Sequence, residues 1–282
     1  MGQVMQRFWG SLALLALATS PAMAKPAPLP EGARYVAMGS SFAAGPGVGP
    51  NTPGSPDRCG RGTLNYPNLL AKQLKLGLVD ATCSGATTQH VLGPWNEVPP
   101  QIESVTAGTR LVTITIGGND VNFVGNIFAA ACELMEKPDA RCQKWREIGE
   151  AEWQANEDRM GQIVRDVRKR APEARIVIVD YITVLPPKGT CTAMAITPQR
   201  MEQNRAAAKR LARMTAQVAR KEGAEVFRFS TLSKTHGPCA ASPWSNGLTA
   251  PAGDGIPVHP NRAGHVAAAM GLAKFLGFKA AR

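Results

Sequence analysis

The chain has 282 residues, with 32 Lys and Arg against 21 Asp and Glu, and a formal net charge of +11 at pH 7. Hydrophobic residues make up 44% and charged residues 19%, which excludes a disordered chain, a collagen-like repeat and a coiled coil. The positive charge is compatible with attraction to anionic lipid or cell-wall surfaces, although an ordinary solvated basic surface is the favoured interpretation. Basic runs interleaved with aromatic residues are absent from the sequence, which argues against a nucleic-acid partner.

Residues 1–24 have the pattern of a cleaved secretory signal peptide. Arg7 is their single charge, residues 8–18 are apolar, and small residues stand at the cleavage positions before Lys25. The apolar run is too short to span a bilayer, so a retained anchor helix is the weaker alternative. We expect removal of residues 1–24, a net charge reduced from +11 to +10, and a secreted or periplasmic protein with no transmembrane segment after processing.

Beyond a Pro-rich lead-in at residues 25–33, short β-branched runs alternate with helical patterns over residues 34–282. The alternation predicts one α/β domain, a three-layer α/β/α sandwich around a mainly parallel five-stranded sheet. The predicted strands cover residues 34–38, 79–83, 110–116, 176–181 and 226–229. The predicted helices cover residues 66–76, 144–171, 197–222 and 261–276.

Two loops that follow predicted strands offer groups for catalysis, because ligands bind at the carboxyl ends of parallel strands. Residues 39–45, GSSFAAG, place Ser41 in a turn of small residues. Residues 83–88, CSGATT, place Gly85 where its backbone N–H could approach an oxyanion. Each loop alone is also compatible with an ordinary turn.

A third loop and a late histidine complete the candidate set. Residues 117–120, GGND, follow the clearest predicted strand, and the amide of Asn119 could donate to a developing oxyanion. We expect Asp120 to brace this loop. His259 stands in a Pro-bounded loop before the last predicted helix, which suits the general base that a serine nucleophile requires. His265 falls inside that helix, and we expect it to be structural.

These three strings and the string VHPNRAGH at residues 258–265, in this order, resemble the sequence blocks of the SGNH hydrolase family, also called GDSL esterases and lipases. The secreted actinomycete-type lipases and phospholipases are the most similar branch. The resemblance implies a flavodoxin-like fold, Ser41 as the nucleophile and His259 as the base. It further implies an oxyanion hole formed by the N–H groups of Ser41 and Gly85 and by the side chain of Asn119. It implies no metal and no cofactor.

The sequence departs from the family pattern at two positions. Ser40 stands where the family usually has Asp, and Ile256 stands three residues before the histidine, where the family often has Asp. One alternative is that the Ile256 carbonyl orients His259, which gives a Ser–His dyad. The other is that the chain bulges at Pro257 and Asp254 completes a triad. The spacing favours the dyad.

All six cysteines lie after residue 24, and none belongs to a C-x-x-C pair. This spacing argues against zinc ribbons and thioredoxin-type sites. Outside the cytosol the expected state is three disulfides, whose pairing the spacing alone does not fix. The family resemblance implies the pairs Cys59–Cys83, Cys132–Cys142 and Cys191–Cys239.

The expected function is therefore a secreted serine esterase or lipase that hydrolyses carboxylic esters through an acyl-enzyme on Ser41. Phospholipase A and O-acetyl esterase activities stay open, although the modest aromatic content favours short or soluble acyl esters. One alternative is a catalytically inactive wall- or glycan-binding module on the same fold. Another is a metal-dependent phosphodiesterase, which the lack of a compact Asp/His metal motif disfavours.

Overall fold

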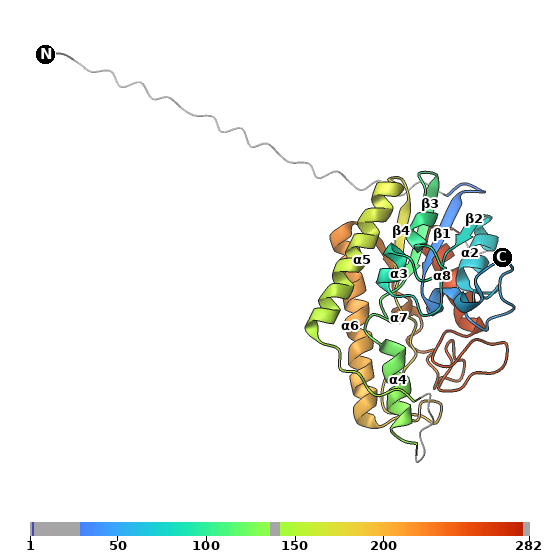
Figure 1. Ribbon diagram of the computed structural model, residues 1–282, viewed down its shortest axis with the longest axis vertical. Helices are drawn as coiled ribbons and strands as arrows, with labels where there is room; N and C mark the ends of the chain where they lie inside the picture. The colour runs from blue at the N-terminus through green and yellow to red at the C-terminus, as the bar shows by residue number, and fades with distance from the viewer. Residues whose placement is uncertain (1, 3–28, 136–141, 279–282) are drawn as a thin grey trace.

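A computed structural model describes residue 2 and residues 29–135 and 142–278 (Figure 1). The predicted signal peptide, apart from Gly2, and residues 25–28 of the lead-in lie outside the described residues. Within them, five strands form one sheet in the order β2-β1-β3-β4-β5. Every neighbouring pair is parallel, as the alternating sequence pattern predicted.

Each of the three central strands is buried at every position but one, because helices cover both faces of the sheet. The predicted second strand is shifted toward the N-terminus in the structure. The carboxylate of Asp80 accepts bonds from the backbone N and the hydroxyl of Thr82, at 3.0 and 2.6 Å, and this local turn ends the strand. The strands are β1 Arg34–Gly39, β2 Gly77–Asp80, β3 Thr109–Thr115, β4 Arg175–Val179 and β5 Glu225–Phe227.

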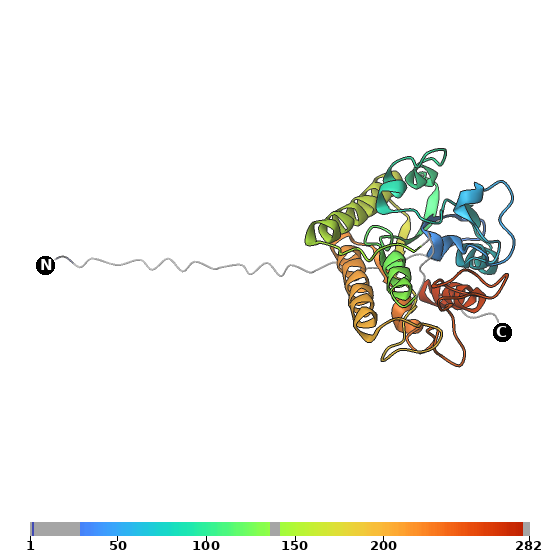
Figure 2. The ribbon, with the colours of Figure 1, turned by 60° about the horizontal axis from the view of Figure 1, so that its bottom comes forward.

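Helices lie on both sides of the sheet (Figures 1 and 2). Helices α2 and α8 pack together on one face, while α3, α5 and α6 follow one another on the other face. This division is the one that right-handed crossovers produce for the observed strand order. The helices are α1 Ser41–Ala44, α2 Tyr66–Leu74, α3 Thr88–Leu92, α4 Phe123–Cys132, α5 Glu150–Arg170, α6 Pro198–Glu222, α7 Phe229–Leu232 and α8 Arg262–Phe275.

The helix predicted over residues 144–171 begins six residues later than expected, at Glu150. Asn126 holds the preceding segment outside the helix, because its side chain accepts a bond from the backbone N of Arg146 and donates one to the backbone O of the same residue, at 3.0 and 2.8 Å. The carboxylate of Glu152 then accepts a bond from Gly149 N and caps the helix. A long-range amide contact therefore sets a boundary that the sequence pattern places too early.

The six cysteines form three disulfides, Cys59–Cys83, Cys132–Cys142 and Cys191–Cys239. These are the pairs that the family resemblance implied. The first disulfide attaches the turn before α2 to the loop after β2, where Ser84 N also donates to Cys59 O at 3.0 Å. No helix within residues 29–135 and 142–278 combines the length and apolar character of a membrane span.

Candidate active site

The loops singled out in the sequence meet at the carboxyl edge of the sheet. Ser40 N donates to Thr115 O at 2.9 Å, which joins the loop after β1 to the end of β3. Cys83 N donates to Gly39 O at 3.0 Å, which joins the loop after β2 to the end of β1. The side chain of Asn119 donates to Ala86 O at 2.8 Å, which joins the third loop to the second. The loops lie together because the carboxyl ends of parallel strands are at the same edge of the sheet.

Ser41 and His259 are in direct contact, although 218 positions separate them in the sequence. The distance from Ser41 Oγ to His259 Nε2 is 2.7 Å, and both residues are buried. A sharp turn presents the serine: Gly39 has a φ of +139°, and a Cβ there would lie 2.3 Å from Thr115 O. Only glycine fits this close approach, and Ser41 begins the short helix α1 directly after it.

The second nitrogen of His259 contacts neither of the groups expected to orient it. Its Nδ1 lies 2.8 Å from the Pro257 carbonyl oxygen. The expectation that the Ile256 carbonyl or the Asp254 carboxylate orients the ring is therefore wrong. The Ile256 carbonyl accepts a bond from Asn246 Nδ2 at 3.3 Å, and the Asp254 carboxylate accepts one from the backbone N at the start of α8 at 2.8 Å.

The backbone at Val258 explains this geometry. Its φ is +60°, a left-handed conformation that strains a β-branched residue. The chain reverses there, so the carbonyl two residues before the imidazole ring comes back to face it. Val258 is completely buried, and its N–H donates to Gly247 O at 2.8 Å, which helps to hold the strained turn.

Burial lowers the pKa of His259 to about 4, against the opposing effect of its hydrogen bond to Pro257. The imidazole is therefore neutral at pH 7. Because a carbonyl can only accept, Nδ1 must carry the ring proton, which leaves the lone pair of Nε2 directed at Ser41. The ring of Phe42 packs against the imidazole with centroids 4.6 Å apart and excludes water from this side. The pair is arranged for proton transfer from the hydroxyl to Nε2.

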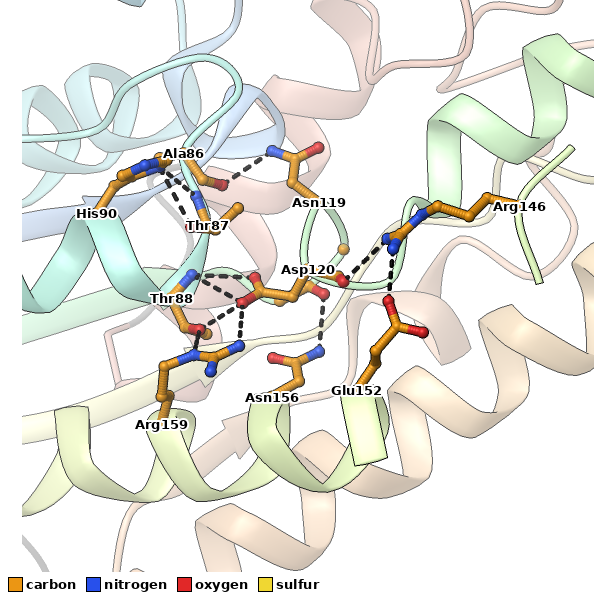
Figure 3. Close-up of polar contacts among 12 residues, drawn as sticks. Ala86, Thr87, Thr88, His90, Asn119, Asp120, Arg146, Glu152, Asn156 and Arg159 are labelled. Atoms are coloured by element: carbon orange, nitrogen blue, oxygen red, sulfur yellow. Dashed lines mark hydrogen bonds and ion pairs between the residues drawn. The ribbon is translucent and has the colours of Figure 1, made fainter. Parts of the chain in front are cut away.

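Three N–H donors surround this edge of the sheet. Within the described residues, the backbone N–H groups of Ser41 and Gly85 have no hydrogen-bond partner. The amide of Asn119 has two hydrogens, and its single bond to Ala86 O leaves one available (Figure 3). These are the three groups that the family resemblance assigned to an oxyanion hole.

Trp95 supports the Gly85 loop and was not singled out in the sequence. Gly85 has a φ of +84°, and a Cβ there would lie 2.9 Å from the Trp95 ring. The indole is itself fixed, because His90 stacks on it at 4.2 Å and the Arg58 guanidinium lies 4.0 Å from its centroid. The Gly85 loop therefore packs against an indole ring that its own neighbours hold in place.

The GGND loop is braced from α5, as Figure 3 shows. Asp120 braces it as expected, since its carboxylate accepts a bond from Thr88 N at 3.0 Å and pairs with Arg159 at 3.2 Å. Asn156 donates to Gly117 O at 2.8 Å, and Gly118 N donates to the Tyr181 hydroxyl at 2.8 Å. Asn156 is a polar residue on the inward stripe of a long amphipathic helix, and that was the one signal in the sequence that could have revealed it.

His265 lies within α8 and outside the Ser41–His259 pair. Its Nδ1 accepts a bond from Tyr66 N at 3.1 Å and so ties α8 to the start of α2. Burial lowers its pKa to about 3. This is the structural position expected for it. In residues 29–135 and 142–278, no three His, Cys, Asp or Glu side chains gather as metal ligands.

Residues 37–267 match the model of the GDSL-like lipase/acylhydrolase family. The chain belongs to this family. The match covers all four loops described above, from the serine turn to the histidine segment. This GDSL-like hydrolase also shares the three-layer fold of the family's solved members, and it is a carboxylic ester hydrolase.

Among curated proteins, the GDSL-like hydrolase is 32% identical to Lipase 2 of Streptomyces coelicolor over 266 residues, which cover 90% of this chain and 89% of the relative. Among solved structures, the extracellular lipase of Streptomyces rimosus has 26% identity and a TM-score of 0.67, over 86% of this chain and 99% of that one. Phospholipase A1 of Streptomyces albidoflavus has 26% identity and a TM-score of 0.69, with the same coverage.

Proposed function

We propose that this protein is an exported serine esterase or lipase that forms an acyl-enzyme on Ser41 with His259 as the general base. The observation that carries the proposal is the 2.7 Å contact between Ser41 Oγ and His259 Nε2. A serine hydroxyl is a weak nucleophile until an adjacent base removes its proton. The neutral, buried imidazole with Nδ1 held by a carbonyl is such a base.

The reaction has two halves. In acylation, Nε2 of His259 takes the hydroxyl proton while Ser41 Oγ bonds to the ester carbonyl carbon. The resulting oxyanion accepts hydrogen bonds from the N–H groups of Ser41 and Gly85 and from Asn119 Nδ2. The imidazolium then gives its proton to the departing alkoxide, and the ester C–O bond breaks. In deacylation, water repeats these steps with Ser41 Oγ as the leaving group.

A carbonyl oxygen, rather than a carboxylate, completes the catalytic group in this proposal. The Pro257 oxygen faces Nδ1–H at 2.8 Å and carries a partial negative charge, which stabilises the imidazolium during each half-reaction. Forming an isolated cation in this buried site is unfavourable, as the low pKa of His259 indicates. The oxyanion forms at the same time, and its negative charge offsets the cost of forming the imidazolium cation. We therefore propose a Ser–His dyad.

The relatives support a lipid ester as the substrate class. The curated relatives are lipases, and one solved neighbour is a phospholipase A1. The acetylxylan esterase of Geobacillus stearothermophilus, at 18% identity and a TM-score of 0.57, shares the fold alone. Export accords with the three disulfides and with the S. rimosus lipase being extracellular. It also accords with the signal-peptide pattern of residues 1–24.

Hydrolysis of p-nitrophenyl butyrate and of phosphatidylglycerol tests the proposal. Ser41→Ala and His259→Gln should each reduce kcat by several orders of magnitude. Ser55→Ala should not, because the Ser55 hydroxyl donates within its own loop, to Thr52 O at 2.8 Å. An organophosphonate fluoride should add one phosphonyl group to wild type, located by mass spectrometry on the Ser41 peptide. Hydrolysis that survives Ser41→Ala would overturn the assignment, and a folded wild type without ester hydrolysis would indicate an inactive binding module.

A further inference from the structure

One side of α8 exposes apolar side chains that no other part of the described chain covers. Six large hydrophobic side chains are exposed within the described residues, and three of them line one open groove of about 1200 Å³. Val266 is 40%, Met270 57% and Leu232 44% exposed. Helix α8 lies at the outside of the fold, so this groove faces solvent (Figure 2). Apolar side chains that gather in one groove and stay uncovered are a feature of interaction sites.

The groove follows the repeat of the helix. Arg262, Val266, Met270 and Lys274 stand four residues apart and form one row along α8. The row is about 18 Å long, with a positive charge at each end and two exposed apolar side chains between. Within the groove, the neighbouring row consists of Ala263, Ala267 and Gly271, whose small side chains leave the hollow beside Leu232.

The groove lining carries more positive than negative charge. Arg262 and Lys274 are the cations among the lining residues, and Asp254 is the single acid. The Asp254 carboxylate already accepts a bond from Arg262 N at 2.8 Å. A helix that exposes apolar side chains between cations has the composition of helices that lie in the plane of an anionic membrane surface. The net charge favours the same partner, since it is +11 for the full sequence and +10 without Arg7 of the predicted signal peptide.

We propose that this side of α8 docks the protein on anionic phospholipid bilayers, with the helix axis parallel to the membrane plane. Val266, Met270 and Leu232 enter the interfacial region, while Arg262 and Lys274 contact lipid phosphates. Arg262 follows His259 by three residues, so docking places the histidine loop beside the membrane. The docking surface contains neither member of the proposed dyad and does not depend on the hydrolytic reaction.

Sedimentation with ether-linked lipid vesicles tests the docking surface, because these lipids contain no ester to hydrolyse. Wild type should bind phosphatidylglycerol-type vesicles more tightly than phosphatidylcholine-type vesicles, and the preference should shrink at high salt. Replacing Val266 and Met270 together with Ser should weaken binding about tenfold or more. Lys274→Gln should weaken binding to the anionic vesicles selectively. The Ser41→Ala variant should bind as wild type, which separates this test from the proposed catalysis.

Leu134 and Met135 supply the matched control, because they are 52% and 51% exposed and line a separate hollow next to α4 that shares no residue with the α8 groove. Their double replacement with Ser removes a similar apolar area and should leave vesicle binding unchanged. Equal loss of binding in both double variants would overturn the proposal. So would a concentration-dependent dimer in sedimentation velocity that the Val266 and Met270 replacements abolish, because the face would then bind a second copy of the chain.

Discussion

Gly85→Ala should reduce kcat sharply, since it disturbs a proposed oxyanion donor in two ways. The φ of +84° at Gly85 is disfavoured for any residue with a Cβ, at a cost of about 1–2 kcal/mol. The new Cβ would also lie 2.9 Å from the Trp95 ring, which cannot withdraw easily between Arg58 and His90. The loop must therefore shift and carry its N–H away from the oxyanion position.

Loss of one oxyanion donor typically costs about 2.7–4 kcal/mol of barrier, so kcat should fall roughly 100- to 1000-fold while KM changes little. The assay is steady-state hydrolysis of p-nitrophenyl butyrate, with a thermal melt to show that the fold persists. Gly54→Ala is the matched control, because Gly54 has a φ of +75° and no atom lies within 4 Å of the added Cβ. It repeats the backbone strain where the added Cβ meets no neighbour, and it should leave kcat unchanged.

A second variant separates the steric effect from the backbone effect. Trp95→Leu removes the ring that the new Cβ would meet, so Gly85→Ala in that background should recover part of the lost kcat. Comparison with Trp95→Leu alone closes the double-mutant cycle. If Gly85→Ala retains the kcat of Gly54→Ala, Gly85 does not donate to the oxyanion and the reasoning fails.

Three further outcomes can be measured. Asp254→Asn should leave kcat/KM within about threefold of wild type, because this carboxylate does not contact the imidazole; a fall of several orders of magnitude would restore the triad. Burial lowers the pKa of His259 to about 4, and the base must be neutral, so kcat/KM should stay level from pH 7.5 to about pH 5 and decline only near pH 4 and below. The rate is followed by chromatography of the released acid. A kcat/KM profile with its midpoint near pH 6.5 would instead show that the His259 imidazole is solvated. Replacing the Cys191–Cys239 pair with Ser should lower the free energy of unfolding in urea by roughly 1 kcal/mol more than replacing the Cys132–Cys142 pair. The reason is that the first disulfide closes a loop with a sequence separation of 48 and the second a loop with a separation of 10. The reverse order of stabilities would contradict this chain-entropy argument.

The sheet and the positions of the catalytic loops could be predicted from the sequence because their causes are local. A run such as that of β4 is apolar at nearly every position, as a strand buried on both faces must be. Small residues directly after β1 and β3 mark the turns, and parallel order then brings those turns to one edge. The pairing of Ser41 with His259 is instead what the resemblance to the SGNH hydrolase family implied, since His259 does not directly follow a strand.

The group that orients His259 could not be predicted, because distant contacts decide it. The positive φ of Val258 runs against the preference of a β-branched residue, so no local rule suggests that turn. Asn246 fixes the approach to the turn by donating to the carbonyl oxygens of Asp254 and Ile256, at 2.7 and 3.3 Å. The family pattern predicts the orienting group only from its distance in sequence to the histidine, so it takes no account of these two Asn246 contacts.

The two members of the proposed dyad come from opposite ends of the folded chain. Ser41 follows the first strand, and His259 precedes the last helix. A polypeptide that emerges N-terminus first, from a ribosome or through an export channel, presents the hydroxyl long before the imidazole exists to activate it. In this proposal, ester cleavage can begin only after His259 has been synthesised and has folded against Ser41. Hydrolytic activity then reports a chain whose first and last segments have both reached their places in the fold.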